Sequence, residues 1–116
     1  MEDFIADIRR GAEQAQNDIC VIFGHIGDCN LHVLLGNLDA AQFDADAVQT
    51  LLYETVEKYQ GSVSAEHGVG LSKRAQLHRS RSPEELQLMM GLKKMLDPQN
   101  ILNPNKIFPA STIEAA

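Results

Sequence analysis

Two histidines flank a short turn-like segment, and a Glu-His pair follows further along the chain. His25 and His32 lie either side of residues 27–30 (GDCN), while Glu66 begins the later pair. If Asp28 and Cys29 form the tip of a β-hairpin, His25 and His32 are directly opposed. Opposed residues hold their Cβ atoms roughly 4.5–5.5 Å apart. Both imidazoles can then reach one metal ion at about 2.0–2.1 Å, and Glu66 can supply a third, anionic ligand.

Two imidazoles and one carboxylate leave an open coordination position on the metal. Such a set binds zinc, iron or manganese, and the open position receives substrate, as in catalytic sites. The competing interpretation is that each histidine is a hydrogen-bonded core residue, which is common for single histidines. His67 follows Glu66 directly, and on an irregular segment its ring could exchange a proton near neutral pH. The alternative interpretation is that His67 is a capping or surface histidine.

A β-hairpin must position the two histidines. Residues 19–26 and 31–35 are rich in β-branched and aromatic side chains and predict its two strands. Both alternating faces of the second strand are apolar, which is typical of a strand covered on both sides. Residues 62–64 predict a short third strand, so that Glu66 and His67 lie at a strand end.

Helices are expected between and after these strands. Helical spacing of apolar residues predicts helices over residues 3–16 and 44–59, and another helix near Ser72. Ser82-Pro83-Glu84-Glu85 has the pattern of a capping box and begins a helix that ends at Asp97-Pro98. Residues 110–116 have too little apolar content to pack firmly.

The order of elements predicts an α+β fold. Helix, strand, strand, helix, strand is a ferredoxin-like antiparallel sheet with helices on one face and its first strand missing, followed by C-terminal helices. We therefore expect residues 1–116 to be a fragment of a longer chain.

Length and charge narrow the class of protein. The 116 residues and 44% hydrophobic content predict one globular domain. Ten Lys and Arg residues against 16 Asp and Glu give a net charge of −6, which disfavours nucleic acid as a partner. No apolar run approaches the roughly 20 residues that span a bilayer, so a cytoplasmic location is expected. The two cysteines, Cys20 and Cys29, form no CxxC pair and are expected to be reduced thiols.

Three motifs together resemble a known family. They are residues 24–32 (GHIGDCNLH), residues 64–70 (SAEHGVG), and residues 96–98 (LDP) with residues 103–106 (NPNK). In order and spacing they are similar to the C-terminal domain of FAD-linked oxidases, a family that includes D-lactate dehydrogenases, D-2-hydroxyglutarate dehydrogenases and the glycolate oxidase D subunit. The resemblance covers nearly all of residues 19–108.

The resemblance implies roles for named residues. His25, His32 and Glu66 would bind a divalent metal (Zn, Mn or Fe), and His67 would be the base on the substrate hydroxyl. Asn103 and Lys106 would lie near the flavin or the substrate. The sequence departs from the family pattern at Cys29 and Asn105, where glycine is usual, and at Leu34, where metal-dependent members often carry asparagine.

The resemblance also implies cofactor and partners. FAD would be bound mainly by an upstream domain that residues 1–116 lack, so this C-terminal substrate or cap domain alone is expected to be inactive. The full-length enzyme would oxidise a small 2-hydroxy acid such as D-lactate, glycolate or D-2-hydroxyglutarate and pass electrons to an acceptor. An exposed sheet edge leaves a homodimer open. The alternative is a stand-alone ferredoxin-like module that binds a metal or small molecule without catalysis.

Overall fold

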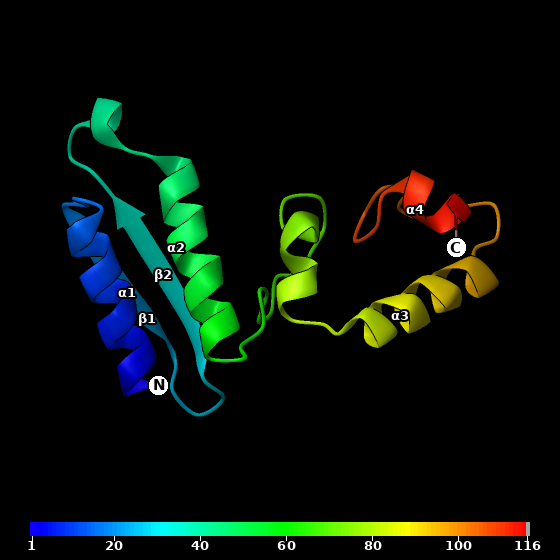
Figure 1. Cartoon of the computed structure of the whole chain (residues 1–116), viewed down its shortest axis with the longest axis horizontal. Coiled ribbons are helices and arrows are strands. Elements are labelled where there is room, and N and C mark those ends of the chain that lie inside the picture. The colour runs from blue at the N-terminus through cyan, green and yellow to red at the C-terminus, as the bar shows by residue number, and fades with distance from the viewer. Residues whose placement is uncertain (116) are drawn as a thin grey trace. The chain divides into compact units, whose positions relative to one another are not determined.

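The chain divides into two compact units. The computed structural model describes residues 1–115, with the first unit at Met1–Gly61 and the second from Ser62 onward (Figure 1). Each unit is described by itself. Within the described residues, every helix is too short or too polar to cross a lipid bilayer.

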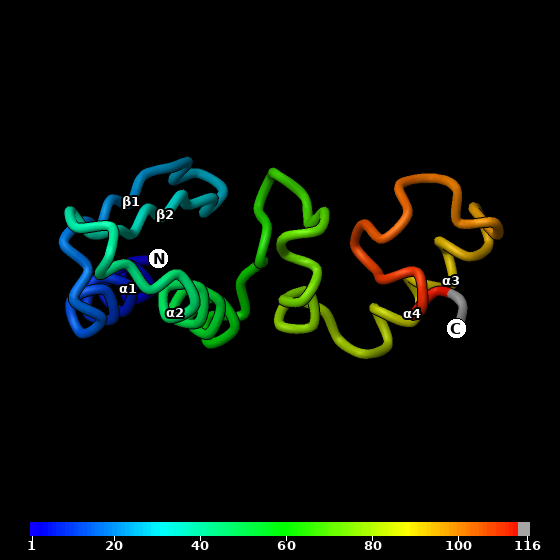
Figure 2. Tube along the Cα trace, turned by 90° about the horizontal axis from the view of Figure 1, so that it is seen from above, coloured from blue at the N-terminus to red at the C-terminus, as the bar shows by residue number. Residues whose placement is uncertain are grey.

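The first unit is an antiparallel hairpin covered by two helices. Its elements, in chain order, are α1 (Glu2–Gln14), β1 (Ile19–His25), β2 (Asn30–Gly36), the 3₁₀ helix η1 (Ala40–Gln42) and α2 (Ala45–Lys58). Figure 2 shows α1 and α2 on the same side of the two strands. In β1 the residues at 19, 21 and 23 are exposed and those at 20 and 22 are half-buried, so the even positions face the helices. The opposite face of the hairpin is uncovered within this unit.

The two helices of the first unit are held by close packing and by one carboxylate. Ile8 and Ala12 of α1 are fully buried. A Cβ atom at Gly11 would lie 2.2 Å from Cδ1 of Leu51, so the glycine allows α1 to approach α2 closely. Oδ2 of Asp7 accepts hydrogen bonds from Nζ of Lys58 at 2.6 Å and from the Tyr59 hydroxyl at 2.9 Å. α1 and α2 therefore pack as a pair.

The hairpin register differs from the one predicted. His32 pairs with Phe23, and His25 pairs with Asn30, so the two histidines are diagonal and not directly opposed. The turn spans residues 26–29, so it begins two residues before the predicted two-residue tip and ends at the same residue. Cys29 adopts a left-handed φ of 59° there, and the Asp28 carboxylate accepts from the Asn30 amide at 3.2 Å. The register moves by an even number of residues, so both histidines stay on one face.

The second unit is helical in its described part. It contains the 3₁₀ helix η2 (Arg74–Arg79), α3 (Pro83–Leu96) and the short α4 (Ala110–Ala115). The capping box of α3 is confirmed, since the Ser82 hydroxyl accepts from the Glu85 amide and the Glu85 carboxylate accepts from the Ser82 amide. The helix predicted near Ser72 is present only as η2. The expectation of loose packing after Ala110 is wrong at Ile113, which is buried.

The predicted third strand does not form, because its backbone groups bond elsewhere. Residues 62–64 are irregular. The Val63 amide donates to the Ser80 hydroxyl at 2.8 Å, and the Ser64 amide lies 3.4 Å from the Ser62 hydroxyl. Short hydroxyl side chains often satisfy the backbone in this way. The predicted α+β class with helices on one face is confirmed, with a two-stranded sheet within residues 1–115.

Candidate metal centre and active-site turns

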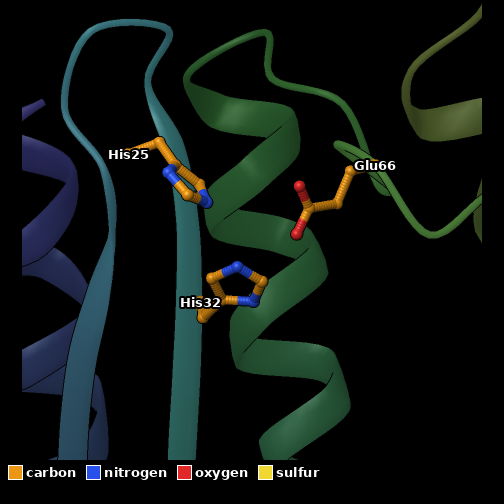
Figure 3. Close-up of side chains that lie close together, drawn as sticks. All are labelled: His25, His32 and Glu66. Carbon is orange, nitrogen blue, oxygen red and sulfur yellow. The ribbon is translucent and has the colours of Figure 1, made fainter.

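His25 and His32 come together on the uncovered face of the hairpin. One ring nitrogen of each lies within 4.8 Å of the other's, and the ring centroids are 6.2 Å apart at an interplanar angle of 70°. Figure 3 shows both rings on the same side of the hairpin. His25 is exposed and His32 is half-buried. Diagonal positions on adjacent strands are within reach of aromatic side chains, so the pair survives the change of register.

The donor set of this pair fits a divalent metal. Two nitrogens that bind one zinc ion at about 2.0–2.1 Å each lie at most about 4.2 Å apart. The separation of up to 4.8 Å needs only modest rotation of the two side chains to reach that value. Neutral imidazole nitrogens suit zinc and iron, whereas manganese favours oxygen ligands such as a carboxylate. The pair leaves the remaining coordination positions to other ligands.

The strand before the turn requires glycine at position 24. Gly24 has a φ of 151°, and a Cβ atom there would lie 2.1 Å from the Asn30 carbonyl oxygen. The absence of a side chain thus lets β1 and β2 approach closely where the turn begins. His25 follows directly, so this close approach helps to fix its position.

Glu66, the third side chain drawn in Figure 3, belongs to the second unit, where it lies beside His67. Nε2 of His67 is 3.4 Å from Oε1 of Glu66, and both side chains are substantially exposed. They form an ion pair when the imidazole is protonated. The backbone around Glu66 and His67 is irregular.

A hydrogen-bonded turn holds the Glu66-His67 segment. The Ser64 hydroxyl donates to the Gly68 carbonyl oxygen at 2.7 Å and accepts from Nζ of Lys73 at 3.1 Å. Gly68 has a φ of 74°, which glycine adopts without strain. The bond from Ser64 to Gly68 closes the chain around Glu66 and His67.

Asn103 and Lys106 lie on a turn that is tied to the segment after His67. The Lys106 amide donates to the Asn103 carbonyl oxygen at 3.2 Å, and the Ile107 amide donates to the Gly70 carbonyl oxygen at 2.9 Å. Nη1 of Arg74 donates to the Asn105 carbonyl oxygen at 2.9 Å. Within the second unit, the two predicted active-site segments are therefore neighbours.

Comparison with known proteins identifies the family. The model of the C-terminal domain of FAD linked oxidases matches residues 1–107. The chain belongs to this family of FAD-linked oxidase C-terminal domains.

Curated members of the family are similar to this chain at 40–50% identity. A D-2-hydroxyglutarate dehydrogenase of Stutzerimonas stutzeri is 50% identical over 95 residues, which cover 78% of this chain and 20% of that protein. One of Xanthomonas citri is 45% identical over 114 residues, covering 93% and 24%. The mitochondrial D-2-hydroxyglutarate dehydrogenase of Arabidopsis thaliana is 44% identical over 92 residues, covering 77% and 16%. The chain thus spans about a fifth of the length of these relatives.

Three residues that support the family motifs escaped the sequence reasoning. Phe23 stacks on His32, with ring centroids 5.0 Å apart and an interplanar angle of 18°. Ser64 and Lys73 hold the turn around Glu66 and His67. Phe23 alternates with His25 along one strand, which is the signal that could have placed it on the same face. The bonds of Ser64 and Lys73 depend on how the chain closes at Gly68, and the glycine alone does not specify which side chains meet there.

Proposed function

We propose that the full-length protein is an FAD-dependent oxidoreductase that oxidises a 2-hydroxy acid to the 2-oxo acid. Family membership over residues 1–107 and identity of up to 50% to proteins named D-2-hydroxyglutarate dehydrogenase carry this proposal. D-2-hydroxyglutarate is the substrate that we place first, and D-lactate and glycolate remain the substrates to compare with it. The stand-alone binding module is not favoured, because the family match spans most of the chain.

When bound, FAD supplies the acceptor for the hydride that leaves C2 of the substrate. In this proposal FAD is held mainly by a domain upstream of these residues, and Asn103 and Lys106 lie near the flavin or the substrate. The hydrogen bonds that tie their turn to Gly70 and Arg74 support a rigid placement. The isolated residues 1–116 should therefore not turn over substrate.

His67 is the proposed general base. An imidazole nitrogen of His67 would take the proton of the substrate hydroxyl while the hydride leaves C2, so that the carbonyl of the 2-oxo acid forms. Glu66, with its carboxylate 3.4 Å from Nε2, would stabilise the protonated ring. The turn closed by Ser64 would keep the ring in place during the transfer.

His25, His32 and Glu66 are the proposed metal ligands. The proximity of the two imidazole nitrogens supports this assignment. A divalent ion, with zinc, manganese and iron as candidates, would supply positive charge that polarises the hydroxyl and carboxylate oxygens of the substrate. The imidazoles of β1 and β2 would hold it in place.

Location and electron acceptor belong to the same proposal. The relative from Arabidopsis thaliana is named mitochondrial, and we propose a cytoplasmic location for this protein on the basis of its sequence. An electron acceptor must reoxidise the flavin, and a homodimer would bury an exposed edge of the hairpin.

An anaerobic visible spectrum of the full-length protein tests the proposed reaction. We expect a flavin band that D-2-hydroxyglutarate bleaches, with D-lactate and glycolate as comparison substrates. Bleaching by one of the other two acids would reassign the substrate. A colourless protein, or a flavin that no 2-hydroxy acid reduces, would overturn the proposed activity.

Metal analysis of the same protein tests the proposed ligands separately. Wild-type protein should hold a divalent ion that a His25→Ala/His32→Ala double variant loses. A His78→Ala variant provides the control, because His78 lies on η2 and has no proposed role. Equal metal content in the wild type and the double variant would rule out these ligands.

A further inference from the structure

Phe23 lies directly against one of the proposed metal ligands. It is the cross-strand partner of His32 in the hairpin register. The two rings are nearly parallel, at 18°, with centroids 5.0 Å apart. This is offset stacking, the arrangement that aromatic pairs prefer. The imidazole of His32 therefore has Phe23 against one face.

The core of the first unit gives no reason for an aromatic side chain at position 23. Phe23 is 53% exposed and lies on the face of β1 that α1 and α2 leave uncovered. Burial consequently gains little from its ring. Its contact with His32 is the interaction that distinguishes it from other exposed apolar residues of that face, such as Val21.

The stack also sets the direction of the His32 ring toward His25. The His25 ring lies at 70° to that of His32, with centroids 6.2 Å apart. Rotation of an imidazole about its χ2 bond is soft, with broad minima. The Phe23 ring stacked on the imidazole of His32 restricts this rotation and keeps a nitrogen of His32 within 4.8 Å of one of His25.

We propose that Phe23 is a positioning residue that holds the imidazole of His32 in the orientation needed for metal binding. This inference rests on the metal site of the proposed function and adds a residue to it. Neighbours that orient a metal ligand typically change metal affinity by 10–100-fold when replaced. Loss of the ring at position 23 should accordingly lower the affinity for the metal about tenfold.

Three variants of the full-length protein separate positioning from general stability. Phe23→Leu keeps an apolar side chain but removes the planar ring, and Phe23→Tyr keeps the ring. Phe43→Leu makes the same change at another exposed phenylalanine, 39% exposed, at the end of η1. Zn²⁺ binding to the metal-stripped proteins is measured by titration calorimetry, and thermal unfolding is recorded in parallel.

We expect Phe23→Leu to raise the Zn²⁺ dissociation constant about tenfold, while Phe23→Tyr and Phe43→Leu stay close to the wild type. Equal affinity in Phe23→Leu and the wild type would overturn the inference and leave the metal site standing. So would an equal loss in Phe43→Leu, or a failure of Phe23→Tyr to restore affinity. A wild type that binds Zn²⁺ no better than the His25→Ala/His32→Ala double variant would overturn the metal site and this inference together.

Discussion

Individual backbone conformations explain several residues around the candidate site. Cys29 and Asn105 stand where the family resemblance leads one to expect glycine, and both have positive φ, 59° and 64°. Glycine adopts this left-handed conformation without strain, and asparagine does so more readily than most residues. The turns thus keep their conformation although the residue type has changed. Cys29, which has no such tolerance, carries the greater cost.

Glycine at position 24 should be indispensable, whereas glycine at position 27 should not. Gly24→Ala is expected to lower the free energy of unfolding by about 2–4 kcal/mol, because its Cβ would meet the Asn30 carbonyl oxygen. Gly27→Ala should change it by less than about 0.5 kcal/mol, since a Cβ there meets nothing within 4 Å. Urea denaturation measures both values. Equal stability of the two variants would contradict this account of the turn.

Replacing Cys29 by glycine should stabilise the hairpin turn. The left-handed conformation costs an ordinary residue roughly 1–2 kcal/mol, and part of this gain is offset by the greater freedom of glycine in the unfolded chain. Cys29→Gly is therefore expected to raise the free energy of unfolding by about 0.5–1 kcal/mol. A Cys20→Gly variant, inside β1, should instead be destabilised. Loss of stability in Cys29→Gly would show that the thiol makes a contact that outweighs the strain.

At the level of elements, local hydrogen bonding decides what forms. The capping box gives α3 a defined first turn, and the same kind of hydroxyl bond at Ser62 and Ser80 prevents a strand over residues 62–64. Asp97 ends α3 by accepting from the Ile101 and Leu102 amides at 3.0 and 2.9 Å. Short polar side chains therefore set the two ends of α3.

Loss of the N-cap should weaken α3 measurably. Ser82→Ala removes the acceptor for the Glu85 amide and is expected to cost about 1 kcal/mol of unfolding free energy. Gln87→Ala, an exposed change inside the same helix, serves as the control and should be within about 0.5 kcal/mol of the wild type. Chemical denaturation measures the free energy of unfolding of both variants and the wild type. Indistinguishable stabilities would mean that the capping box contributes nothing to the fold.

Acid should destabilise the second unit through Asp97. The pKa of Asp97 lies below its ordinary value of 3.8, mainly because the Lys93 ammonium group donates to it, with the Leu102 and Ile101 amides adding to the effect. The unfolded chain then binds the proton more readily, so stability is fully present above about pH 5 and falls as the pH drops below about 4. In Asp97→Asn this acid-dependent loss should be smaller, whereas Glu54→Gln, on α2, should follow the wild type. Melting temperatures of the three proteins between pH 3 and 7 measure this acid-dependent loss of stability. If Asp97→Asn lost as much stability in acid as the wild type, the role of Asp97 would be contradicted.

At the scale of the whole molecule, this chain corresponds to only part of its relatives. The chain spans 20% of the Stutzerimonas stutzeri relative and 24% of the Xanthomonas citri one. In the proposed function, these residues supply the metal ligands, the general base and the turn that lies near the flavin or the substrate. Kinetic predictions therefore concern the full-length enzyme.

His67→Asn should slow chemistry more than it weakens binding. Removing a general base typically lowers the rate by about 10²–10⁴-fold, while the affinity for the 2-hydroxy acid should change only a few-fold. Stopped-flow flavin reduction measures both, as limiting rate and substrate dissociation constant. His78→Asn, at an exposed histidine of η2, is the matched control and should reduce its flavin at the wild-type rate. An unchanged rate in His67→Asn would remove His67 from the mechanism.

The sequence alone determined α1, α2 and α3, the presence of the hairpin, the capping box and the family. These depend on periodicity, on caps and on motifs that act over a few residues, so they can be recognised in one dimension. Tertiary structure decided the register of the hairpin, because Gly24 and the turn over residues 26–29 set which residues pair. It also decided that His32 faces Phe23 and that residues 62–64 bond to Ser80 instead of a neighbouring strand. Residues far apart in the sequence compete for the same backbone groups and ring faces, and the folded structure decides which of them pair. No local sequence pattern predicts the outcome.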